Sequence, residues 1–380
     1  MRRRRSIILI AVLTLAGTAA AQAVSQEVVR PPQPGGTLAA RMEWAAREAA
    51  RRAYREGFWR GYSIRRLMGE RSSIGTFDDR SSSEATLQEI TTGQKLGMAS
   101  PSRDERVRQR ARQVLDDLEN EGRPDRKVWK DVAILVRYGK ASKTEPERVD
   151  MSNLNLPFDL RGLPLIWLGE ATDEESLAWL KTSYREMRTG VAKEHILAAV
   201  GIHQSPALVV PILASVLESQ ETAELRKNAT FWLGQQNDRK AYDILMQTAN
   251  KDRSRDVREG AVFAVSQIEL EESVDGLIGL AKSADDREVR HQAIFWLGQK
   301  ASNKATEALK NMAYEGGETK IQEQAVFALS QLPGNEGVEA LIKVAKTHPN
   351  TVMRKKAIFW LGETGDPRAL EVLIEIIKGK

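Results

Sequence analysis

The sequence has no cysteine and only four histidines among its 380 residues. The lack of cysteine excludes disulfides, thiolate metal sites, thiol catalysis and a lipid anchor on an N-terminal cysteine. The histidines, His195, His203, His291 and His348, share no common register, and none is followed by glutamate. Phosphate-binding glycine loops, G-x-S-x-G elbows and zinc-spaced histidine pairs are also missing. We therefore predict no cofactor, no metal and no enzymatic activity.

Long apolar runs are missing too, apart from one at the start of the chain. Residues 2 to 5 are arginine, residues 7 to 16 are apolar, and the segment ends in Ala19-Ala20-Ala21-Gln22-Ala23. This pattern predicts a signal peptide over residues 1–23, cleaved after Ala21 or Ala23, and an exported protein, periplasmic or secreted. A short uncleaved anchor is the alternative, although a membrane span needs roughly 20 apolar residues.

The excess of basic residues depends largely on that segment. The chain has 57 Lys+Arg and 52 Asp+Glu, and removing the four leading arginines leaves 53 against 52. A net charge of about +1 gives no support for nucleic-acid binding.

The second half of the chain repeats every 32 residues, over five units. Four columns keep the same register: phenylalanine at 231, 263, 295, 327 and 359; alanine at 229, 261, 293, 325 and 357; leucine at 245, 277, 309, 341 and 373; and a small residue at Gly234, Ser266, Gly298, Ser330 and Gly362. Fainter copies extend upstream to Gly169 and Gly201. Each unit contains two apolar stripes with helical spacing, separated by short polar turns. Such hairpins bury their apolar faces only by stacking, which predicts a mostly α fold, an α-solenoid.

The segments Val257-Arg258-Glu259-Gly260-Ala261 and Val289-Arg290-His291-Gln292-Ala293 resemble HEAT repeats, in particular the short variety named after phycobilisome lyases. The resemblance covers about residues 170 to 380, as six hairpins and a final single helix. It implies that the helix carrying the Val-Arg motif lines the concave face. The family resemblance extends to an iron hydroxylase with paired His-Glu steps, which this sequence lacks, and to lyases of cytoplasmic client proteins, which conflict with export.

A helical wheel of the second helix places the phenylalanine column between two mostly polar columns. One turn later stands a column of amides, ending in one glutamate. We predict from these two columns a partner-binding surface made of Phe231, Gln235, Phe263, Gln267, Phe295, Gln299, Phe327, Gln331, Phe359 and Glu363. Armadillo solenoids look similar in that an aromatic and an amide residue four apart hold an extended peptide. The alternative is that the rings only pack between repeats.

Three other columns favour structural roles. Tryptophan alternates with alanine at 167, 199, 232, 264, 296, 328 and 360, which indicates large-against-small packing and a 64-residue double unit. Arginines 226, 258, 290 and 354, with Gln322 interrupting, are expected to bond neighbouring repeats or loop carbonyls. Acids at 243, 275, 307, 339 and 371 are expected to form a solvated outer stripe.

The first 168 residues lack the repeat. We predict a flexible linker over 24–37 and an α+β capping region over 38–168, followed by the solenoid over 169–380. Within the cap we expect a helix over 38–56, a strand starting at Phe58, a mobile loop over 72–103 and a helix over 103–120. A strand at 132–136 pairs with 149–158, and Thr172 begins a capping box at the first solenoid helix.

These patterns predict an exported, non-enzymatic scaffold that binds a protein or an extended peptide on its concave face. One alternative is an envelope regulator that docks on an anionic surface through the arginine-rich segment 41–71, where aromatic residues interleave with nine arginines. The other alternative is a lyase-like enzyme, which requires a deep polar pocket. The partner's identity and the oligomeric state stay open, and no integral membrane segment is expected after signal cleavage.

Overall fold

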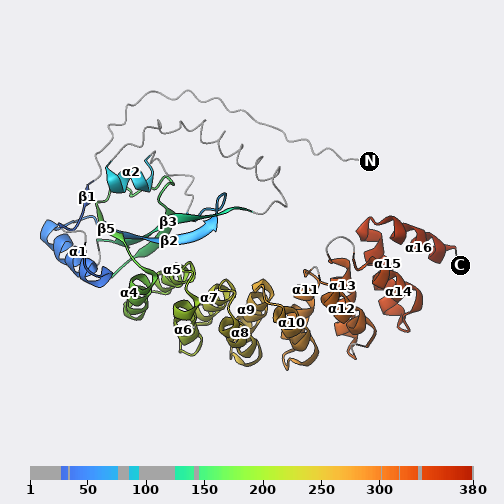
Figure 1. Cartoon of the computed structure of the whole chain (residues 1–380). Helices are drawn as coiled ribbons and strands as arrows, with labels where there is room; N and C mark the ends of the chain where they lie inside the picture. Colours follow the sequence, from blue (N-terminus) through green and yellow to red (C-terminus); the bar gives the residue numbers. More distant parts are fainter. Residues whose placement is uncertain are drawn as a thin grey trace.

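A computed structural model describes residues 27–32, 35–75, 85–93, 125–140, 145–300, 302–315, 317–332 and 336–378. A small sheet with two flanking helices lies at one end of a long row of helical hairpins, and the last helix lies at the other end (Figure 1). The fold is therefore mostly helical, with repeated hairpins and a small N-terminal α+β region, as the sequence predicts.

The sheet has five strands in the order β1-β5-β2-β3-β4. Its centre is the long antiparallel pair β2 (Phe58–Gly69) and β3 (Lys127–Tyr138), which stays in register along its full length. On one side β4 (Arg148–Asn153) pairs antiparallel with β3; on the other, β5 (Leu165–Glu170) runs parallel to β2, and β1 (Val28–Val29) runs parallel to β5. The predicted strands at Phe58, at 132–136 and at the start of 149–158 are confirmed.

The two faces of the sheet have separate cores because side chains alternate along a strand. One face carries Tyr62, Ile134 and Ile166, and its core continues without interruption through the solenoid to Ala369. Helix α1 (Leu38–Arg52) covers part of this face, at the place where the sequence predicts a helix. The opposite face holds a smaller core with Trp59 and Trp167, to which the short helix α2 (Leu87–Thr92) contributes Leu87. The sheet thus closes the N-terminal end of the solenoid with apolar contacts, as a cap must.

The solenoid consists of six hairpins and a single last helix, as predicted. The first helices of the hairpins, with the last helix, are called the outer helices: α4 (Asp173–Glu186), α6 (Pro206–Leu217), α8 (Arg239–Lys251), α10 (Glu272–Ser283), α12 (Asn303–Glu315), α14 (Val338–Thr347) and α16 (Pro367–Ile377). The second helices are called the inner helices: α5 (Gly190–Gly201), α7 (Ala223–Gly234), α9 (Arg255–Gln267), α11 (Arg287–Leu297), α13 (Thr319–Ser330) and α15 (Thr351–Thr364). The two rows follow a shallow arc with the inner helices on its inside (Figure 1).

Polar caps begin several of these helices where the sequence changes from a turn to an apolar stripe. Thr172 and Glu175 form the predicted capping box of α4. Asp238 accepts bonds from the backbone N–H groups of Lys240 and Ala241, and Asp366 accepts one from Arg368. Such caps satisfy N–H groups that the helix itself leaves free.

Alternation of large and small residues sets the packing between neighbouring inner helices. Gly234 touches Ala264, and Gly298 touches Ala328, so closely that a Cβ on either glycine would lie within about 3 Å of the next backbone. Trp232, by contrast, lies with its ring over Gly201. Close and ring-filled junctions therefore alternate along the inner row, which accounts for the predicted 64-residue double unit.

Four predictions about the N-terminal region need correction. The prediction of a flexible linker is wrong at Val28–Val29, which form strand β1 and pair with β5. Their apolar side chains and backbone groups extend the edge of the sheet. The upstream extension of the repeat is wrong at Trp167 and Gly169, which lie in strand β5. The proposed boundary at 169 therefore falls inside a strand, and the first solenoid helix begins at Asp173.

The expected loop over 72–103 contains helix α2, which a Thr86–Glu89 capping box starts and Gly93 ends in the left-handed conformation. Residues 76–84 and 94–103 of that segment lie outside the described residues, as does the predicted helix over 103–120.

Candidate functional site

The predicted phenylalanine column lies along the inner helices and keeps part of every ring at the surface. The exposed fraction is 40% for Phe231 and 59% for Phe359, and Phe263, Phe295 and Phe327 are half-buried. None of the five rings is enclosed in the core.

The rings also touch one another through the tryptophans of the neighbouring column. Phe231 and Phe263 stack with centroids 6.4 Å apart and planes at 11°, and Phe263 continues to Trp296 at 4.9 Å. Further contacts at about 5 Å join Phe231 with Trp232, Phe295 with Trp296, and Phe327 and Phe359 with Trp360. We call these eight side chains the aromatic strip: Phe231, Trp232, Phe263, Phe295, Trp296, Phe327, Phe359 and Trp360. The two interpretations of the column therefore coexist, since the rings pack between repeats and still present an apolar surface.

The amide column, one turn further along each inner helix, is exposed at every position: Gln235, Gln267, Gln299, Gln331 and Glu363. We call this set the amide ladder. The side-chain Nε2 of Gln267 donates to Ser266 Oγ at 3.1 Å, and Gln331 does the same with Ser330. Glycine stands at the corresponding position before Gln235 and Gln299, so the hydroxyl support alternates along the ladder with the 64-residue unit.

The two glutamates beside the aromatic strip are paired with basic residues close at hand. Glu259 pairs with Arg255 at 2.8 Å, and Glu323 pairs with Lys356 at 3.3 Å. His291 lies 3.9 Å from Glu288, but burial lowers the pKa of this imidazole. The inner surface next to the rings is therefore polar and close to neutral.

The arginine column has the structural role that the sequence favours. Arg226 donates to the backbone oxygen of Glu221 and to both carboxylate oxygens of Asp252, at 3.0 and 3.1 Å. Arg258 repeats the arrangement with the Asp252 carbonyl and the Asp286 carboxylate, and this hydrogen bond holds the pKa of Asp286 below its usual value. The remaining members of the column, Arg290, Gln322 and Arg354, also donate to backbone oxygens at the end of the preceding outer helix or just after it.

The acidic column lies exposed on the outer helices, as predicted, and two of its members form ion pairs with the next repeat. Asp275 pairs with Lys304 at 2.5 Å and Glu339 with Arg368 at 3.7 Å. Pairs this exposed stabilise a fold by at most about 1 kcal/mol each.

The arginine-rich segment of the cap is largely neutralised by acids of the same segment and of neighbouring elements. Arg51 and Arg52 both bond Glu48 and lower the pKa of this carboxyl to about 2. Arg41 pairs with Glu175; further ion pairs join Arg47 to Glu43, Arg65 to Asp131 and Arg71 to Asp125. Arg60 is buried, with its guanidinium over the ring of Tyr138 at 4.2 Å. These contacts do not favour an interface for an anionic surface.

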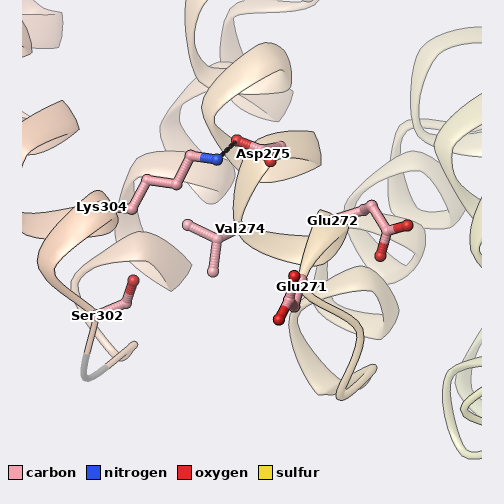
Figure 2. Close-up of a pocket in the computed structure, with 6 residues that line it drawn as sticks. All are labelled: Glu271, Glu272, Val274, Asp275, Ser302 and Lys304. Atoms are coloured by element: carbon pink, nitrogen blue, oxygen red, sulfur yellow. Dashed lines mark ion pairs between the residues drawn. The ribbon is translucent and has the colours of Figure 1, made fainter.

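An open pocket of about 470 Å³ lies on the outer side, between the starts of α10 and α12. Figure 2 shows its lining, with Lys304 reaching across to Asp275: Glu271, Glu272, Val274, Asp275, Ser302 and Lys304. This lining has no nucleophile paired with a base. Within the described ranges, no group of three His, Asp or Glu side chains could hold a metal ion, and no helix is long and apolar enough to cross a bilayer.

One polar network escaped the sequence analysis because its members come from separate elements. The Tyr62 hydroxyl of β2 lies 2.9 Å from Ser176 Oγ of α4, which lies 2.9 Å from His203 Nε2 after α5. His203 Nδ1 donates to the Ala199 carbonyl at 2.8 Å, so in the neutral ring Nε2 accepts from Ser176. We call this the junction network, since it joins the cap to the first hairpin. Isolated His, Ser and Tyr residues carry no spacing signal that would reveal it.

Comparison with known proteins identifies the repeat. A family model described as HEAT repeats matches residues 210–298 and 306–380. Among solved structures, human deoxyhypusine hydroxylase is similar with 21% identity over 52% of this chain and 76% of that chain, at a TM-score of 0.23. The complex of CpcE and CpcF of phycocyanin lyase from Nostoc sp. is similar with 22% identity over 53% and 80%, at 0.29. The YibA protein of E. coli follows with 20% identity over 53% and 75%, at 0.32. No curated protein sequence matches this one.

The helical hairpins, their 32-residue step and the family match agree: the C-terminal part of this chain is an α-solenoid of HEAT-like helical hairpins.

Proposed function

We propose that the protein is an exported, non-catalytic scaffold whose HEAT repeats, of the short phycobilisome-lyase-like type, hold an extended segment of a protein partner on the inner face. The observation that supports this most is the pairing of a half-exposed aromatic strip with an exposed amide ladder along the same helices. Apolar rings bind side chains of many kinds, and amides can both donate to and accept from a peptide backbone.

Two further features support a binding role over a catalytic one, and export has separate support. The pocket on the outer helices is open and lined by three carboxylates and one lysine, without a reactive pair. The inner surface offers amides and rings, which recognise a chain without changing it. Export rests on the leading arginines, the apolar run and the A-x-A sites of residues 1–23.

Site-directed photo-crosslinking tests the binding face. A photoreactive phenylalanine analogue is placed at Phe231, Phe295 or Phe359, and in a matched set at Asp243 or Glu371 on the outer helices. We expect the inner positions to give one shared adduct with an envelope protein, and its crosslinked residues to fall in a single extended segment. Adducts from the outer set alone, or unrelated adducts from each inner position, would contradict the proposal.

Export is tested separately with fractionation of cells that make the full chain and a variant without residues 1–23. The full chain should be found outside the cytoplasm in a shortened form, whereas the variant should stay inside. An unshortened full chain that stays inside would overturn this part of the proposal.

A further inference from the structure

We infer that the segment held on the aromatic strip is proline-rich and takes the polyproline II conformation, with one turn of the ligand on each repeat. This inference rests on the proposed function and specifies its ligand. Four features of the inner face lead to it, beginning with the distance between repeats.

The usual spacing of packed helices is close to the pitch of a polyproline II helix. Neighbouring inner helices are in direct contact, as Gly234 against Ala264 shows, and packed helices lie about 8–10 Å apart. A polyproline II helix has about three residues per turn and rises about 3.1 Å per residue, so its pitch is about 9 Å. A ligand in this conformation presents the same side to every repeat. A β-strand would not, because its side chains alternate and every third residue points the opposite way.

The aromatic strip is a surface of ring faces and edges. Phe231 and Phe263 stack at 6.4 Å, and the Trp296 ring follows at 4.9 Å, which leaves no space between them for a long side chain. Flat pyrrolidine rings suit such a surface, and aromatic-lined grooves are the usual sites for polyproline II segments.

Unused donors stand beside the rings at every second repeat. Within the part of the chain that the structure describes, the indole N–H groups of Trp232, Trp296 and Trp360 have no acceptor and are not enclosed. An indole N–H can only donate. A polyproline II chain has no internal hydrogen bonds, so its carbonyl groups are free to accept. Tryptophans two repeats apart would meet about every sixth residue of the ligand.

The paired glutamates beside the strip give a basic segment little advantage. Glu259 and Glu323 lie beside the strip, but each is already paired, with Arg255 and Lys356 respectively. A charged ligand would have to compete with these pairs, whereas a proline-rich segment leaves them intact. Binding of this kind should depend little on salt, since screening weakens only charge interactions.

The test uses the full protein and fluorescent peptides of about twelve residues, which make about four polyproline II turns. One peptide is oligoproline, and the other is an uncharged Ser/Thr/Val sequence without proline. We expect saturable binding of oligoproline by anisotropy, at least tenfold weaker binding of the second peptide, and less than a twofold change between low and high salt. Halving the oligoproline should weaken binding at least tenfold, because fewer repeats are engaged.

Trp296→Phe tests the donors, since it keeps a ring and removes the N–H group. Loss of one hydrogen bond should weaken oligoproline binding roughly three- to tenfold. Trp129→Phe is the matched control: Trp129 is 60% exposed but lies on β3, away from the strip, so binding should not change.

Equal binding of both peptides, no binding of oligoproline, or an equal effect of the two tryptophan changes would overturn the inference. If oligoproline fails while photo-crosslinking still finds one extended partner segment on the inner helices, the scaffold function stands and only the ligand conformation is wrong. If both fail, the proposed function falls as well.

Discussion

The cap is stabilised by contacts between residues far apart in the sequence, whereas the solenoid is stabilised by contacts between neighbouring repeats. In the cap, Trp59 of β2 lies opposite Leu165 of β5, and Gly61 lies opposite Leu135 of β3, so that neighbours in the sheet come from distant segments. In the solenoid, each hairpin contacts the hairpins immediately before and after it. The cap must therefore form as one unit, whereas the solenoid is nearly a one-dimensional series of similar junctions.

This difference predicts how damage spreads from a buried site. Contacts between distant segments are lost together, because the entropy lost in closing the long loops is offset only when the whole sheet forms. Contacts between adjacent repeats can open locally, with the rest of the stack intact. Function follows the same division, since the repeated inner surface can hold a long ligand and the cap protects one apolar end.

The largest effect is expected from truncating one fully buried leucine in each region. Leu135→Ala in the cap and Leu277→Ala in the solenoid remove the same group from full burial, and each should destabilise its surroundings by about 2–5 kcal/mol. In hydrogen exchange, Leu135→Ala should expose β2, β3, β4 and β5 together. Leu277→Ala should raise exchange only in the hairpins around α10 and leave the cap protected.

A cap that loses protection only next to position 135, or a solenoid that opens along its whole length after Leu277→Ala, would contradict this division. Unfolding of both variants with one uniform exchange rate would show instead that the continuous core through both regions makes a single cooperative unit.

The same division explains what the sequence could predict. Each contact in the solenoid is repeated five times in the sequence, once in every 32-residue unit. The periodicity therefore predicts the hairpins, the single last helix and the buried alanine and leucine columns. The Phe and Gln columns also follow, because a wheel places them beside polar neighbours. A contact between two strands occurs once in the sequence, between segments that have no common repeat. For that reason the sequence predicts a linker at β1 and a repeat position at Trp167. The junction network was missed for the same reason.

An intermediate effect should come from glycines at the contact between repeats. A Cβ on Gly234 would lie 2.9 Å from the Ala264 carbonyl oxygen and 3.0 Å from its Cα, atoms that cannot move without shifting helix α9. Gly234→Ala should therefore destabilise the protein by about 1–3 kcal/mol in chemical denaturation.

Gly279→Ala provides the matched control on outer helix α10. No atom lies within 4 Å of the added Cβ there, so the better helix propensity of alanine should stabilise the protein by up to about 1 kcal/mol. Similar effects of the two changes would mean that repeat spacing is not set by this contact. Gly298→Ala, against Ala328, should reproduce the loss and would show that the double unit behaves the same at both copies.

The smallest effect concerns the junction network, where the two regions meet. Burial lowers the pKa of His203 in the folded protein, an effect that the nearby Asp173 opposes and Arg66 adds to. In the neutral ring, Nε2 accepts from Ser176, which in turn lies next to the Tyr62 hydroxyl. A protonated ring would donate at both nitrogens, and the Ser176 hydroxyl would then accept from Nε2 and donate to the Tyr62 oxygen. Burial therefore remains the main reason that the charged form is disfavoured in the fold.

The pH dependence follows from this lowered pKa. Neutral His203 stabilises the junction fully above the ordinary histidine pKa of about 6.5, and this contribution is lost as the pH falls toward the lower pKa of the folded state. Between pH 7.5 and 5.5 the wild-type protein should lose more stability than His203→Gln, by at most about 1.4 kcal/mol for each pH unit. Hydrogen exchange at the lower pH should first rise at the end of α5 and in the part of β2 near Tyr62, before the distant hairpins. An identical pH dependence for wild type and His203→Gln would show that the cap and the solenoid are joined by apolar packing alone.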